Sequence, residues 1–114
     1  MSKPLTHHVI TRAREILADE KRWTQGTDAR KRNGQPTSPY DQFARRFCAT
    51  GALSRAAFEL TNDASKAGRL AGAACTQLCP RNEDPIYSVQ RINDNRRRGH
   101  AAVLKLFDDY LAAA

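Results

Sequence analysis

The sequence contains the residue types of a thiol-dependent catalytic centre, in which an imidazole activates a cysteine and a third polar group orients the ring. Cys48 and His100 supply the thiol and the imidazole, and Asp94 or its neighbour Asn93 could supply the third group. Catalytic thiols favour helix N-termini, because the helix dipole lowers their pKa there. The pattern described below instead predicts that Cys48 lies well inside a helix, on its apolar side. We therefore expect no catalytic residue, and a small thiol-dependent enzyme using Cys48 and His100 is the alternative.

Two further cysteines have a spacing that could suit a metal ion. Cys75 and Cys79 are four residues apart, so a helix through both would place the thiols on one face, with Cys48 or His100 completing a ligand set. No C-x-x-C pair accompanies them, and small residues at helical spacing before Pro80 are typical of packing. We expect neither a metal nor another cofactor.

A second group of residues could line a ligand pocket. An indole can stack on a planar ligand, while neighbouring hydroxyl, amide and imidazole groups hydrogen-bond to it. The structural alternative is that the only tryptophan anchors the core, that the Asn-Asp pair forms a turn and that the histidine bonds a carbonyl. The candidate ligand-binding residues are Trp23, Thr24, Gln25, Asn93, Asp94 and His100.

Positive charge is the strongest feature of the composition. The formal net charge is +7, and eight Lys or Arg residues against two Asp lie between Lys21 and Arg55. Basic clusters attract nucleic acid or acidic proteins, although charge runs are often only solvated. The candidate anion-binding residues are Arg30, Lys31, Arg32, Arg45, Arg46, Arg96, Arg97 and Arg98.

The elements that must position these residues are predicted to be helices. Apolar residues recur at three- and four-residue spacing in four segments, over residues 6–19, 39–60, 63–78 and 99–111. We expect a mainly α, single compact domain of about four helices spanning residues 1–114. A short β-hairpin is compatible with the Asn33-Gly34 turn signal. Residues 86–92 alternate between apolar and polar, which fits either a short strand or a helical turn.

The predicted position of Cys48 depends on the second predicted helix. Ser38 suits an N-cap, Pro39 the first helical position and Asp41 the third, so a helix is expected to run from there to about residue 60. Glycine costs about 1 kcal/mol relative to alanine inside a helix. Gly51 therefore indicates close packing against another backbone or a bulky ring.

Three segments occur together in a characteristic order: Arg22-Trp23-Thr24-Gln25-Gly26, then Phe47-Cys48-Ala49-Thr50-Gly51-Ala52-Leu53, then Asn93-Asp94 followed by His100 and Val103-Leu104. Over most of the chain this resembles a family of small bacterial and phage proteins of unassigned function. Its members carry R-W-T-Q-G, C-x-x-G-A-L and W-N-D…R-T-H-x-x-V-L. The chain departs from that pattern at Ile92, where the pattern has Trp, and at Gly99, where it has Thr. The resemblance implies no activity, substrate or cofactor.

The remaining features of the sequence narrow the class of protein. The start of the chain lacks the apolar run of a secretory signal, and no stretch approaches the roughly 20 apolar residues of a membrane span. Three cysteines fit a reducing compartment. We therefore expect a cytoplasmic, non-enzymatic interaction module for an anionic partner, either nucleic acid or an acidic protein, without membrane association and phage-related by its resemblance.

Overall fold

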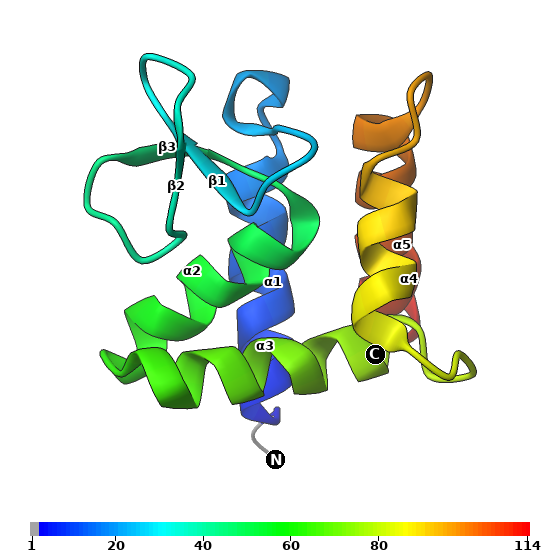
Figure 1. Cartoon of the computed structure of the whole chain (residues 1–114). Helices are drawn as coiled ribbons and strands as arrows, with labels where there is room; N and C mark the ends of the chain where they lie inside the picture. The colour runs from blue at the N-terminus through cyan, green and yellow to red at the C-terminus, as the bar shows by residue number, and fades with distance from the viewer. Residues whose placement is uncertain (1–2) are drawn as a thin grey trace.

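A computed structural model describes residues 3–114, which form a mainly helical fold with a small antiparallel sheet (Figure 1). A 3-10 turn, Glu20–Arg22, follows the first helix. The helices are α1 (Leu5–Leu17), α2 (Ala49–Thr61), α3 (Ala64–Leu78), α4 (Pro85–Asn93) and α5 (Gly99–Ala113), and the strands are β1 (Ala29–Lys31), β2 (Pro36–Thr37) and β3 (Ala44–Phe47). The described residues thus contain five α-helices, one more than predicted.

The core lies where α1, α2 and α3 meet, with α4 and α5 packed beside them (Figure 1). The predicted apolar stripe of α1 is confirmed, because Val9, Ile10, Ala13, Ile16 and Leu17 are all buried. The buried face of α3 consists mostly of alanine and cysteine, which lets this helix run closely across α1 and α2. None of the helices in residues 3–114 is both long and apolar enough to cross a membrane.

Two helix starts show how local sequence sets the boundaries. The carboxylate of Asp63 accepts a hydrogen bond from the backbone N–H of Lys66 and so caps the start of α3. Asp84 does the same for the N–H of Tyr87, with Pro85 at the first position of α4. This cap resolves the ambiguity of residues 86–92, which are helical.

The predicted helix over residues 39–60 is wrong in its first half. The Ser38 hydroxyl accepts from the N–H of Tyr40, and the Asp41 carboxylate accepts from the N–H of Phe43. These side chains therefore close turns instead of capping a helix. The chain then forms β3, and α2 begins only after Cys48. The local sequence pattern contains no sign of strand pairing. This pairing makes the segment a strand and not the first half of a helix.

The sheet has the order β2-β1-β3, with both pairs antiparallel. The predicted hairpin at Asn33-Gly34 is confirmed as the connection between β1 and β2, and Gly34 adopts φ of 90°. Ala29 lies opposite both Thr37 and Phe47, and the register shifts between Arg30 and Lys31. The sheet anchors the chain immediately before α2.

Gly51 confirms the predicted close approach and identifies the neighbour as backbone. A β-carbon at this position would lie 1.8 Å from the carbonyl oxygen of Asp28. The same carbonyl accepts a hydrogen bond of 3.1 Å from the backbone N–H of Cys48. The first turn of α2 is therefore pressed against the segment that leads into β1.

Candidate functional site

Asn93, the last residue of α4, joins the three sequence segments singled out above. Its side chain is 1% exposed, and its Oδ1 accepts from Trp23 Nε1 and from the backbone N–H of Ala49, each at 2.8 Å. Its Nδ2 donates to the Thr24 carbonyl at 3.0 Å and to Asp94 Oδ1 at 3.1 Å. The amide thus makes all four of its hydrogen bonds within the fold.

Gln25 and Asp94 complete this polar junction. Gln25 Nε2 donates to the carbonyls of Asn93 and Asn95, at 3.0 and 2.8 Å. Asp94 Oδ1 also accepts from the backbone N–H of Gly26 at 3.2 Å. The structure therefore brings the candidate ligand-binding residues together, but several of their polar atoms bond to one another.

His100 lies on the other side of the junction from Cys48. Its Nε2 is 2.7 Å from the carbonyl oxygen of Leu17, and its ring centroid is 5.4 Å from that of Trp23. A carbonyl can only accept, so Nε2 carries the proton and donates it. The hydrogen-bonding neighbours of the Cys48 thiol are instead Thr50, Gly51 and Asp28. The Cys48–His100 pair of the enzymatic alternative is not formed.

Cys48 itself occupies the N-cap position of α2, so the prediction that it lies inside a helix is wrong. Its Sγ accepts from the backbone N–H of Gly51 at 3.2 Å and lies 3.7 Å from Asp28 Oδ1. A helix N-terminus favours a thiolate. Here burial nevertheless raises the pKa of the Cys48 thiol above its ordinary value, and the nearby Asp28 carboxylate adds to this. At neutral pH the sulfur is a protonated thiol and not a nucleophilic thiolate.

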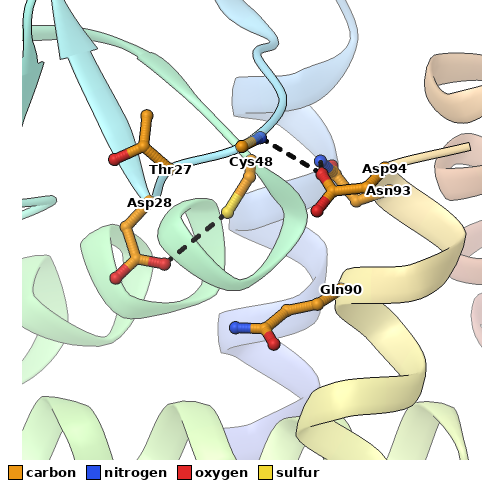
Figure 2. Close-up of a pocket in the computed structure, with 7 residues that line it drawn as sticks. Thr27, Asp28, Cys48, Gln90, Asn93 and Asp94 are labelled. Carbon is orange, nitrogen blue, oxygen red and sulfur yellow. Dashed lines mark hydrogen bonds between the residues drawn. The ribbon is translucent and has the colours of Figure 1, made fainter. Parts of the chain in front are cut away.

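A polar cleft of about 220 Å³ opens beside Cys48 (Figure 2). The segment before β1 contributes one wall and the end of α4 the other, and the carboxylates of Asp28 and Asp94 come from these two sides. The cleft therefore offers the acceptor oxygens of two carboxylates beside the Cys48 thiol. Three of its lining residues belong to no sequence pattern identified above: Thr27, Asp28 and Gln90.

Cys75 and Cys79 are both buried near the end of α3. Burial raises the pKa of the Cys75 thiol to about 12, so it stays protonated at neutral pH. Within residues 3–114 no three or more histidine, cysteine or acidic side chains are arranged to hold a metal ion.

The loop between α4 and α5 presents three consecutive arginines around a second depression, of about 280 Å³, which we call the basic hollow. Arg96, Arg97 and Arg98 are exposed, and Asn95 Oδ1 accepts from the backbone N–H groups of the last two at 3.1 and 2.9 Å. The remaining lining residues of the basic hollow are Glu20, Trp23, Gln25, Gly99, His100 and Ala101. Asn95 thus fixes the loop backbone while the three guanidinium groups face solvent.

Gly99 explains how the basic hollow joins the polar junction. A β-carbon here would lie 2.4 Å from the Asn93 carbonyl oxygen and 2.8 Å from Trp23 Cζ2. The threonine that the resembled pattern has at this position does not fit the arrangement in this chain. The absence of a side chain lets the arginine loop pack directly onto the indole.

The other predicted anion-binding residues divide into two groups. The Arg30 guanidinium donates to Thr24 Oγ1, to the Gly34 carbonyl and to the Gln25 carbonyl, at 2.8, 3.0 and 3.1 Å. Arg30 therefore braces the fold through three hydrogen bonds, and its role in anion binding stays a prediction. The residues that lie on the sheet or its turn with groups open to solvent are Lys31, Arg32, Arg45 and Arg46.

Fold and site together define a small, mainly helical protein built around one polar junction, with a cleft and a basic hollow on either side of it. The chain belongs to the Family of unknown function (DUF6197), whose model matches residues 1–113. This confirms the resemblance to a family of unassigned function. No curated protein and no solved structure matches the chain.

Proposed function

We propose that this protein is a non-enzymatic binding module for nucleic acid that contacts phosphate groups through the basic hollow. One observation carries the proposal: Arg96, Arg97 and Arg98 stand exposed around a depression without a carboxylate bound to them. The ion pairs among residues 3–114 are Arg12–Glu59, Arg14–Asp108 and Lys105–Asp109, and none involves these arginines.

The geometry of the loop suits an anion with several acceptor oxygens. A guanidinium group can donate two parallel hydrogen bonds to a phosphate, and it stays charged at any physiological pH. The backbone of the loop is already held by Asn95. Binding therefore has to order the side chains but not the loop, which lowers the entropic cost. Glu20 is the acidic residue on the rim, so the charge around the hollow remains positive.

Nucleic acid fits this surface better than an acidic protein does. Protein interfaces have an apolar centre surrounded by a polar rim. The large apolar side chains that are exposed in the described chain are Leu5, Phe43, Leu60, Ile86 and Tyr87, and none of them lines the basic hollow. Contact there would rest on charge, which is how proteins hold a phosphate backbone without reading its sequence.

A second basic segment extends the surface. The turn between β1 and β2 lies at the same end of the molecule as the α4–α5 loop (Figure 1). Hydrogen bonds connect the turn to the loop. Arg30 donates to the carbonyls of Gly34 in the turn and of Gln25, and the side-chain amide of Gln25 donates to the carbonyl of Asn95 in the loop. A polyanion could therefore span both without a change in their relative position.

Fluorescence polarisation with a labelled oligonucleotide tests the proposal. The variant R96S/R97S/R98S removes the positive side chains of the hollow, and K66S/R69S/R81S removes the same charge from exposed residues outside it. We expect the first variant to lose most of the affinity and the control to retain most of it. The magnitude of the slope of log affinity against log salt should fall by about 2–3, because each of three contacts contributes about 0.7–0.9.

Two outcomes would overturn the proposal. Equal losses in both variants would mean that the affinity reflects net charge and not the hollow. Tighter binding of a polyglutamate peptide than of the oligonucleotide would assign the surface to an acidic protein.

Trp23 provides an independent signal, because it is the only tryptophan and lines the hollow, so its fluorescence should change on binding.

A further inference from the structure

Phe43 is an aromatic side chain held in the open beside positive charge. It is 58% exposed and directly precedes β3. The sheet that begins at the next residue, together with its turn, carries four basic residues with groups open to solvent, which we call the basic sheet surface: Lys31, Arg32, Arg45 and Arg46. Lys31 lies opposite Ala44, the residue after Phe43, in the pairing of β1 with β3.

The loop that leads to Phe43 is held by hydrogen bonds to the residues just before it. The Asp41 carboxylate accepts from the Phe43 N–H at 2.9 Å and is also bonded to the Thr37 hydroxyl. Arg55 donates from one nitrogen to the carbonyls of Pro39 and Asp41, at 3.2 and 2.8 Å. The backbone that leads to Phe43 is therefore held in place, and its ring is exposed.

Arg45 adds a positive charge that is held at the backbone on either side of Phe43. Its Nη1 donates to the carbonyls of Gln42 and Ala44, the two residues that flank Phe43, at 2.9 and 3.0 Å. These bonds use one nitrogen of the guanidinium group and leave its other donors available. Arg46 follows immediately and is exposed. An aromatic face and guanidinium donors thus lie within a few residues of one another.

We propose that Phe43 stacks on an unpaired base while Arg45 and Arg46 bind the adjoining phosphates, so that the preferred ligand is single-stranded nucleic acid. This inference rests on the proposed function and specifies its ligand. In a duplex the base faces are covered by neighbouring bases, so an exposed ring finds no partner there. In a single strand, stacking on aromatic side chains combined with a positive surface is the usual mode of binding.

The test compares two exposed aromatic residues. Tyr87 on α4 is 57% exposed and has the Arg91 guanidinium 5.9 Å from its ring centroid, so it matches Phe43 in exposure and in having an arginine nearby. Tyr87 follows Glu83 and Asp84, however, and lies outside the basic sheet surface. Affinities of F43A and Y87A for a labelled single-stranded oligonucleotide and for the corresponding duplex are measured by fluorescence polarisation.

We expect F43A to weaken single-strand binding by about 5- to 10-fold, the lower part of what one base–aromatic stack contributes. Duplex binding should change by less than about 2-fold, as should both affinities of Y87A. F43W should restore single-strand binding, since indole also stacks on bases. Circular dichroism checks that the variants are folded. We expect them to be folded, because both replaced side chains are exposed.

The outcomes separate this inference from the proposed function. If the wild-type protein binds neither oligonucleotide, both are wrong. If binding requires Arg96, Arg97 and Arg98 but F43A binds both ligands as the wild type does, only the stacking role is wrong. An equal loss for single strand and duplex in F43A would likewise overturn the stacking role, because it would show a contact that does not depend on an unpaired base.

Discussion

Replacing Asn93 with alanine should be the most destabilising polar substitution in the junction. The substitution leaves two buried groups without partners, the N–H of Ala49 and the carbonyl of Thr24, and a partly buried one, the indole N–H of Trp23. A buried polar group without a partner costs about 1–3 kcal/mol. We expect a loss of about 3–5 kcal/mol in the free energy of unfolding, a large part of the roughly 5–15 kcal/mol of a typical domain.

Urea unfolding followed by far-UV circular dichroism measures this loss, and Asn95→Ala is the matched control. Asn95 also accepts two backbone hydrogen bonds, from Arg97 and Arg98, but at exposed positions where water can replace it. The control should lose about 1 kcal/mol or less. A loss below about 1 kcal/mol in N93A, or similar losses in both variants, would refute the reasoning that Asn93 holds the segments together.

One glycine substitution with its control, and one thiol-labelling reaction, test the packing around α2. Gly51→Ala should lower the melting temperature, with about 1–3 kcal/mol of overpacking against the Asp28 carbonyl, whereas Gly68→Ala, whose β-carbon would meet only the Tyr40 hydroxyl at 3.8 Å, should be neutral or stabilising. A stable G51A protein would show that this contact yields easily. Iodoacetamide should alkylate Cys48 slowly in the folded protein at neutral pH, because burial raises the pKa of its thiol, and rapidly after denaturation. Fast labelling of the folded protein, read by mass spectrometry, would revive the thiol-dependent alternative.

The polar junction gives a physical reason for the three sequence segments to occur together. Trp23, Ala49 and Asn93 come from parts of the chain far apart in sequence, and one amide oxygen accepts from the first two. The same junction positions the basic hollow, because Gln25 bonds the carbonyls on both sides of Asp94 and Gly99 packs on the indole. The N93A substitution should therefore also disturb anion binding, although Asn93 does not line the hollow.

Elements with strong local signals followed from the sequence. The apolar spacing of α1 and the Gly34 turn were predictable, because each depends on a few neighbouring residues. The close packing at Gly51 was predictable as well, because a glycine inside a helix indicates a close neighbour, although the sequence did not identify Asp28 as that neighbour. The sequence also predicted which residues to consider around the junction. It did not predict Asp28, Thr27 and Gln90 at the cleft, since these residues belong to no recognisable pattern.

What the sequence by itself determined is the mainly helical character, the excess of positive charge and the membership of a family of unknown function. Only the tertiary structure decided where Cys48 lies and what surrounds it. Residues 44–47 have a helix-like apolar spacing, yet they pair with β1, because hydrogen bonds to a distant strand outweigh a weak local preference. That pairing moves the start of α2 to the cysteine, while burial keeps its thiol protonated and the Leu17 carbonyl holds His100 elsewhere.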